Sequence, residues 1–205
     1  MEKRTLDYYL SLQSPWTYLG HDRVLALAAA HDVEVELYPV DFGVIFPATG
    51  GLPLPKRAPE RRAYRMAELE RWSEYLNLSL NLKPRHFPVD EKLATRVVVS
   101  ARRESTADAI ALTGRILSAV WSEERDIADP ETLREIIESL NLDADELLEK
   151  AGEKSAAERI VKDTDRAIAR GVFGAPTYIV DSNLFWGQDR LDFVERQLAK
   201  IPASA

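Results

Sequence analysis

The strand-helix-strand pattern near the start of the chain constrains the fold more than any other feature of the sequence. Residues 5–12 place apolar side chains at every second position and predict a strand. Residues 15–30 predict a helix, and residues 33–37 alternate again before Pro39. Because crossovers of this kind are right-handed, the two strands are expected to lie parallel in one sheet.

The end of the chain predicts a second part of the same sheet. Residues 177–180 and 184–186 have the composition of strands, and residues 181–183 between them resemble a turn. This pattern predicts a β-hairpin. A last helix is expected to follow, with its apolar face formed by Leu191, Val194, Leu198 and Ile201.

The middle of the chain carries helix signals and no strand signal. Residues 46–59 are rich in proline and glycine and predict a loop. Apolar residues then recur at helical spacing in four runs: Leu69, Trp72 and Leu76; Ile110, Thr113, Leu117 and Val120; Leu133, Ile136, Ile137 and Leu140; Leu147, Leu148 and Ala151. We therefore expect an all-helical domain, residues 46–152, inserted into an α/β domain made of residues 1–45 and 153–205.

Capping signals divide this helical stretch. Asp129 before Pro130, and Asp143 three residues before Glu146, are typical helix starts. Gly152 predicts a helix end, and another helix is expected to end at the residues before Gly171.

The composition excludes several classes of function. The chain of 205 residues has a formal net charge of −7, which argues against a general nucleic-acid binder. It has no signal-like start and no apolar stretch long enough to span a bilayer, so we expect a cytoplasmic protein without a membrane partner. With no cysteine and only three histidines in no metal-binding spacing, neither a disulfide nor a metal site is expected.

Ser14 and Pro15 stand where the first strand gives way to the first helix. Proline suits the first helical position, and the serine hydroxyl lies where backbone N–H groups converge. A helix N-terminus favours negative charge and is a recurrent place to hold a thiolate. Since the chain has no thiol of its own, the sulfur has to come from a ligand. Read structurally, the same pair is an ordinary helix cap.

Four segments, taken in their order and spacing, carry a family resemblance that spans nearly the whole chain. They are residues 7–9 (DYY), 14–20 (SPWTYLG), 171–177 (GVFGAPT) and 185–190 (FWGQDR). The chain resembles the thioredoxin fold of the DsbA-like disulfide oxidoreductases, and most closely the 2-hydroxychromene-2-carboxylate isomerases and kappa-class glutathione transferases. The resemblance implies an α/β, thioredoxin-like fold with an inserted all-helical domain. The oxidoreductases have a nucleophilic cysteine where this chain has Ser14, which points away from disulfide exchange.

The resemblance implies glutathione as cofactor and assigns residues to it. Ser14 would donate a hydrogen bond to the glutathione sulfur and favour its thiolate. A cis bond before Pro176 would leave the main chain of Ala175 free to pair with the tripeptide as an added strand. The γ-glutamyl end would meet the segment Trp186, Gly187, Gln188 and Asp189, with Gln188 and nearby amides on the carboxylate and Asp189 on the ammonium. Without the resemblance, Pro176 is a loop proline and Asp189 a helix cap.

Residues for the substrate are predicted from charge and aromatic character. Trp16 is a candidate wall of an aromatic pocket, and Lys56, Arg57 and Arg61 are candidates to attract an anionic substrate. Residues 85–88 (RHFP) resemble a family segment near the substrate pocket, which makes Arg85 a further candidate. The basic residues also fit a solvated charged face. Many family members have a lysine and an asparagine in positions occupied here by Pro47 and Gly51, on the substrate side of the pocket.

The implied reaction is the interconversion of 2-hydroxychromene-2-carboxylate and trans-o-hydroxybenzylidenepyruvate in aromatic hydrocarbon catabolism, by reversible thiol addition to an aromatic carboxylate substrate. Two alternatives remain open: a kappa-like transferase or peroxidase that acts on other electrophiles, and a non-catalytic thioredoxin-fold binding protein. The resemblance also implies a homodimer.

Overall fold

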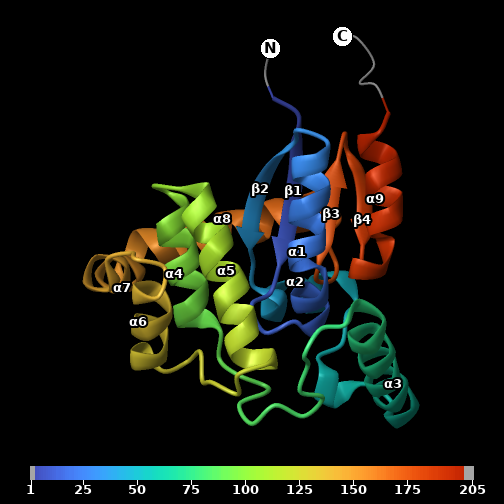
Figure 1. Cartoon of the computed structure of the whole chain (residues 1–205), viewed down its shortest axis with the longest axis horizontal. Helices are drawn as coiled ribbons and strands as arrows, with labels where there is room; N and C mark the ends of the chain where they lie inside the picture. The colour runs from blue at the N-terminus through green and yellow to red at the C-terminus, as the bar shows by residue number, and fades with distance from the viewer. Residues whose placement is uncertain (1–2, 201–205) are drawn as a thin grey trace.

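A four-stranded sheet lies at the centre of the computed structural model, which describes residues 3–200 (Figure 1). The strands are β1 (Thr5–Leu10), β2 (Glu34–Pro39), β3 (Thr177–Val180) and β4 (Asn183–Trp186), in the order β2-β1-β3-β4. β1 and β2 are parallel, β3 is antiparallel to β1, and β4 is antiparallel to β3. The predicted strand-helix-strand unit and C-terminal hairpin are confirmed.

The alternation predicts a first strand that ends at Leu12, but β1 ends at Leu10. Leu12 is still buried, so the apolar pattern is genuine. The chain leaves the sheet because the next polar groups bind elsewhere: the Ser11 hydroxyl and the Gln13 N–H donate to the Glu91 carboxylate.

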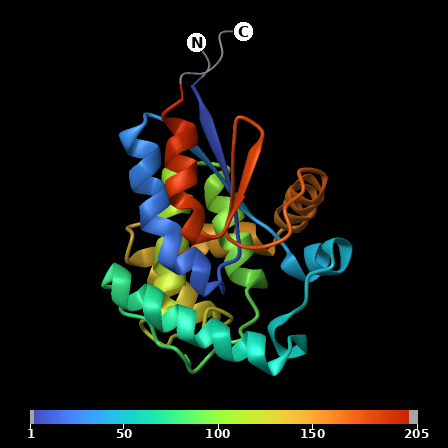
Figure 2. The same cartoon turned by 90° about the vertical axis from the view of Figure 1, so that its right-hand side faces the viewer.

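Helices cover both faces of the sheet (Figure 2). On one face lie α1 (Pro15–Ala30), with the predicted bounds, and α9 (Leu191–Leu198). On the other lie α2 (Phe42–Thr49) and α8 (Lys154–Ala169). Successive β1 side chains point to opposite faces, so Tyr8 packs in one apolar cluster and Tyr9 in the other. Ile201, predicted on the last helix, lies outside the described residues.

The stretch between β2 and β3 is helical, as predicted. Its longer members are α3 (Pro59–Leu76), α4 (Lys92–Arg102), α5 (Thr106–Trp121), α6 (Pro130–Glu138) and α7 (Ala144–Gly152). The aspartates expected to start α6 and α7 are their N-caps, and α7 ends at the predicted Gly152. Within residues 3–200, no helix combines the length and the apolar character that crossing a membrane requires.

The loop predicted for residues 46–59 is partly wrong. Its first residues belong to α2, and Leu54–Lys56 form a 3-10 turn. Asp41 caps α2 and Gly50 ends it in the left-handed conformation, while Phe42 and Ile45 bury its apolar side. Capping and burial outweigh the cost of Pro47 inside so short a helix. The expected domain boundary between residues 45 and 46 therefore falls within a helix.

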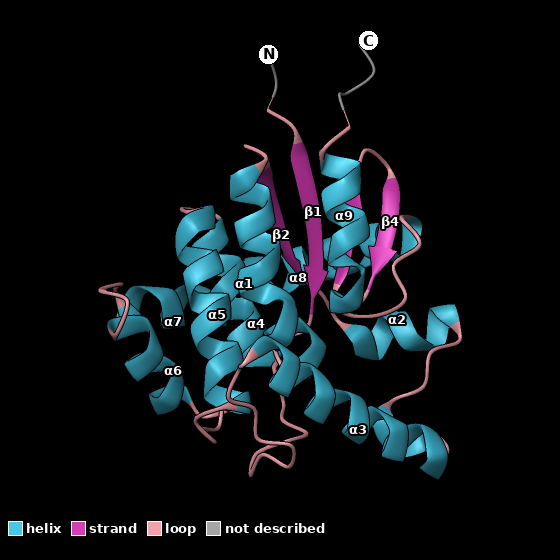
Figure 3. Cartoon of the chain, turned by 45° about the vertical axis from the view of Figure 1, so that its right-hand side comes forward, coloured by secondary structure: helices cyan, strands magenta, loops and turns pink. Residues whose placement is uncertain are grey.

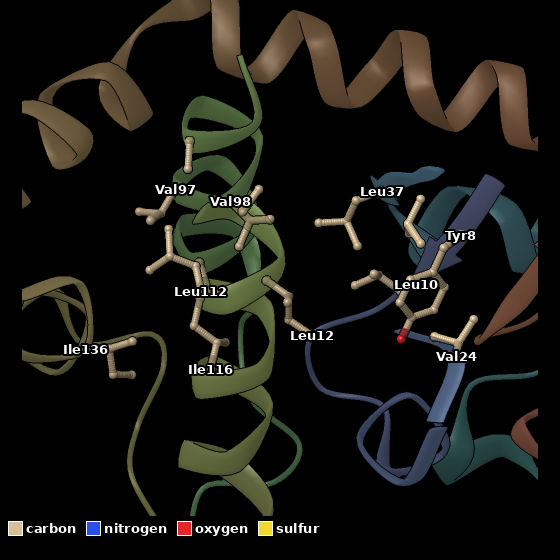
Figure 4. Packing of buried hydrophobic residues seen from close by; sticks show 14 of the residues in the cluster. Tyr8, Leu10, Leu12, Val24, Leu37, Val97, Val98, Leu112, Ile116 and Ile136 are labelled. Atoms are coloured by element: carbon tan, nitrogen blue, oxygen red, sulfur yellow. The ribbon is translucent and has the colours of Figure 1, made fainter. Parts of the chain in front are cut away.

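The helical stretch and the sheet share one apolar core. Val98 of α4 and Ile116 of α5 belong to the same cluster as Leu10, Leu12 and Leu37 (Figure 4). Leu12, in the loop between β1 and α1, lies between the two groups of side chains. This shared packing fixes the start of α1 relative to α4 and α5. The division into two domains stays a prediction.

Candidate functional site

Strand register brings the distant predicted segments to one edge of the sheet. Tyr9 near the end of β1 pairs with Thr177 at the start of β3, and Thr177 pairs with Trp186 at the end of β4. Hence the loop before α1, the Ala175-Pro176 peptide and the segment after Trp186 meet at this edge. In Figure 3 the arrowheads of β1 and β4 point to the same edge, beside α2 and α3.

Ser14 is the N-cap of α1. Its Oγ accepts a hydrogen bond from the Thr17 N–H at 3.3 Å, and Pro15 occupies the first turn. The hydroxyl hydrogen remains to be donated to another acceptor. The first turn of α1 carries no acidic side chain, so the positive end of the helix dipole is not neutralised from within the helix. This half-buried position suits an anionic ligand atom.

The peptide bond between Ala175 and Pro176 is cis, as the resemblance implies. The Pro176 carbonyl accepts from the Gly187 N–H at 2.9 Å, which ties this loop to the residue after β4. Within residues 3–200, the N–H and C=O of Ala175 take part in no hydrogen bond. Both groups are therefore available to an added extended peptide.

An aromatic pair stands beside this loop. The rings of Phe173 and Trp186 have centroids 4.9 Å apart, and the side chains are 40% and 51% exposed. Gly174 lies directly against the indole, since a Cβ there would come within 2.3 Å of Trp186 Nε1. The pair offers an apolar wall that no other described side chain covers fully.

The segment after β4 divides its polar side chains between interior and surface. Gln188 is only 1% exposed, and its side-chain oxygen accepts from Arg23 of α1. Arg23 also donates to the Gln188 carbonyl at 3.1 Å. Asp189 is exposed, pairs with Arg190 at 3.1 Å and faces Gly187, whose φ is +102°. The ligand roles assigned to Gln188 and Asp189 stay predictions, but the Gln188 side chain faces inward.

Three arginines gather around the start of α3. Burial and the Arg61 charge lower the pKa of Arg57, and burial together with Arg57 lowers the pKa of Arg65 to about 10. The Arg65 guanidinium lies 5.6 Å from the centroid of the Phe87 ring. None of the three arginines forms an ion pair with another described residue. We call Arg57, Arg61 and Arg65 the arginine cluster.

The other predicted substrate residues come from three different segments. Trp16 is half-buried in the first turn of α1, and Lys56 is exposed before α3. Arg85 lines a depression of about 260 Å³ that also includes His86 and Asp126. A Cβ on Gly51 would meet the Phe46 ring at 2.5 Å. The close packing accounts for glycine there.

A larger hollow of about 470 Å³ lies between α1 and α5. It includes Tyr18, His21 and Arg115 and none of the predicted ligand residues. Burial lowers the pKa of His21, whose Nε2 is 3.2 Å from the Ile110 carbonyl. This histidine is a satisfied neutral core residue.

Sequence reasoning missed two residues that hold the site together. Arg23 fixes the segment after β4 and lies 5.7 Å from the Trp72 ring of α3. Glu91 binds the loop before Ser14. Neither lies in a local motif, because both act on partners far away in the sequence.

The sheet order, the capped first helix and the cis-proline loop together define a thioredoxin-fold protein with serine at the start of its first helix. The chain belongs to the DSBA-like thioredoxin domain family, whose model matches residues 5–199.

Similar proteins of named activity narrow the class of function within this family. The chain is 31% identical over 196 residues to the 2-hydroxychromene-2-carboxylate isomerase of Sphingobium xenophagum, covering 95% of this chain and 98% of that one. It is 24% identical over 213 residues to glutathione S-transferase kappa 1 of Homo sapiens, covering 96% and 92%. A solved 2-hydroxychromene-2-carboxylate isomerase superposes with a TM-score of 0.79 at 26% identity, covering 94% and 93%. The relatives named as isomerases support an isomerase.

Proposed function

We propose that the protein is a glutathione-dependent isomerase that interconverts 2-hydroxychromene-2-carboxylate and trans-o-hydroxybenzylidenepyruvate. The observation that carries the proposal is the start of α1: Ser14 caps a helix end without an acidic neighbour in its first turn. The free main chain of Ala175 lies on the same sheet edge. The named isomerase relatives, similar over most of the chain, supply the substrate.

The residues at this edge fit a cysteine-containing tripeptide. The N–H and C=O of Ala175, which bond to no other residue in the described part of the chain, suit a peptide backbone laid alongside. The exposed carboxylate of Asp189 suits an ammonium group, and the Phe173–Trp186 pair suits the apolar parts of the ligand. Glutathione, when bound, supplies a thiolate that adds reversibly to a conjugated double bond, so that rotation and thiol release leave the isomer.

The chain's own residues favour and orient the reacting groups. The Ser14 hydroxyl donates a hydrogen bond to the ionised sulfur, and the α1 dipole stabilises the same charge. The arginine cluster attracts the substrate carboxylate, because its charges are not neutralised by described acidic residues. Holding both groups in one site supplies the usual gain from proximity.

An absorbance assay tests the proposal. Purified protein is mixed with 2-hydroxychromene-2-carboxylate, with and without glutathione, and free thiol is titrated before and after turnover. We expect isomerisation only when glutathione is present, with no net loss of thiol. Conversion at the same rate without glutathione, or no conversion with it, would contradict the proposal.

The kappa-class relative favours a second candidate, glutathione transfer to another electrophile. Transfer consumes one thiol for each product molecule, whereas isomerisation consumes none. The same thiol titration, repeated with electrophiles other than chromene acids, therefore separates the two activities.

A further inference from the structure

The loop that carries Ser14 is held by a residue from the start of α4. Each Glu91 carboxylate oxygen lies 2.9 Å from the Ser11 hydroxyl. The Gln13 main-chain N–H donates to Oε2 at 3.0 Å, and the Gln13 side-chain amide donates to Oε1 at 3.1 Å. A single carboxylate thus binds both polar residues between the end of β1 and Ser14.

Holding a loop with this carboxylate costs free energy, because a charged group is buried without a charged partner. The donors to the carboxylate are neutral hydroxyl and amide groups, and no lysine, arginine or histidine among residues 3–200 pairs with it. Burial raises the pKa of Glu91, because the interior disfavours its charge. Apolar packing often stabilises a fold as well as a buried charge does. The choice of a carboxylate points to a need for defined geometry.

Glu91 is itself rigidly placed. Its carbonyl accepts from the Thr95 N–H at 2.8 Å and from the Thr95 hydroxyl at 2.7 Å. The following turns of α4 bury Ala94, Val97 and Val98 in the shared core. The carboxylate therefore transmits the position of α4 to the loop.

The geometry assigns Glu91 as a positioning residue: it fixes Ser11 and Gln13 so that the next residue, Ser14, caps α1 and directs its hydroxyl at the ligand sulfur. Ser14 depends on this loop directly, because its N–H donates to the Ser11 carbonyl at 3.2 Å. The assignment rests on the proposed function for the sulfur ligand. The hold on the loop itself does not depend on any ligand.

Glu91→Gln tests this role, because loss of charge and loss of Ser14 alignment would change the pKa of a bound thiol in opposite directions. Glutamine keeps the shape of the side chain but has one acceptor oxygen, whereas Ser11 and Gln13 now donate to both oxygens of the carboxylate. Loss of a nearby negative charge, by itself, would lower the pKa of a bound thiol. Loss of Ser14 alignment would raise it, because the thiolate loses its hydrogen bond. We expect the rise, by about one unit or more, which is a tenfold smaller thiolate-to-thiol ratio.

The experiment has two readouts. Ultraviolet titration of the thiolate of bound glutathione gives the thiol pKa in wild type, Glu91→Gln and Ser11→Ala, the last of which removes a donor and keeps the charge. Hydrogen exchange without glutathione reports on the amides of Gln13 and Thr17, which should exchange faster in both variants. Ser105→Ala, which removes the N-cap of α5, is the matched control for a lost cap elsewhere. It should leave the thiol pKa and the amide exchange at Gln13 and Thr17 unchanged.

The outcomes separate the two hypotheses. A thiol pKa that falls or does not move in Glu91→Gln, or unchanged exchange at Gln13 and Thr17, overturns the positioning role. Absence of any bound thiolate in the wild type instead contradicts the proposed function, and the exchange data still decide whether Glu91 holds the loop. If Glu91→Gln does not fold, Ser11→Ala carries the same test.

Discussion

Replacing Ser14 by alanine should separate a stability effect from a chemical one. The hydroxyl accepts from Thr17 at 3.3 Å, a long capping bond. A serine cap is worth about 0.5–2 kcal/mol, so we expect a loss of unfolding free energy near the lower end, about 0.5–1 kcal/mol. A hydrogen bond to a charged partner contributes about 1.5–3 kcal/mol. The thiol pKa of bound glutathione should therefore rise by about one to two units.

Rates measured against pH show this effect. At neutral pH and saturating glutathione, the variant should isomerise about 2 to 10 times more slowly: a bound thiol with a pKa of about 6 is mostly ionised in the wild type, and a rise of one to two units leaves about half to a tenth of it as thiolate. The deficit should shrink as the pH rises past the variant's thiol pKa. Urea denaturation gives the stability change, and Ser105→Ala again supplies a lost cap away from the site.

One result would refute this reasoning. If Ser14→Ala lost stability as the control does and kept the wild-type rate at neutral pH, the hydroxyl would be a cap and nothing more. A rate deficit independent of pH would also count against the thiolate role, since it would place the hydroxyl's effect outside thiol ionisation.

Three further substitutions test the fold and the site. Asp163→Ala should lower the unfolding free energy by about 3–5 kcal/mol in urea denaturation, because it leaves the buried Arg102 guanidinium without its carboxylate partner; a loss below about 1 kcal/mol would contradict this. Arg65→Met should raise KM for the chromene acid about tenfold with little change in kcat, by steady-state kinetics; an unchanged KM would remove the arginine cluster from substrate binding. A hydrogen bond from Arg4 lowers the pKa of Asp181 in the folded protein. The ion pair therefore stabilises the fold fully above the pKa that the carboxyl has in the unfolded chain, and this stabilisation is lost as the pH falls through the lower folded-state pKa. Asp181→Asn should therefore reduce the loss of stability in acid, and an identical stability profile below pH 4 would contradict the pairing.

The elements predicted best from the sequence are those specified by local patterns. α1 has its predicted bounds because alternation stops at Ser14 and Pro15 starts a helix. The hairpin followed from residues 177–186, and the caps of α6 and α7 from Asp129 and Asp143. In each case the signal and the structure lie within a few residues of one another.

The predictions that failed or were missing depend on distant contacts. Pro47 indicates a loop locally, yet burial of Phe42 and Ile45 against the sheet and α8 keeps α2 helical. The inward direction of Gln188 depends on Arg23, and the early end of β1 depends on Glu91. No pattern within either segment shows these partners, because they join it only after the chain has folded.

The central claim is that the start of α1 holds glutathione as its thiolate. Isothermal titration calorimetry with glutathione at pH 7, in two buffers of different ionisation enthalpy, measures both binding and proton release. The free thiol, with a pKa of about 8.5, is mostly protonated at this pH. We expect saturable heat with one site per chain and release of close to one proton on binding. No heat at millimolar glutathione, or binding without proton release, would contradict the claim.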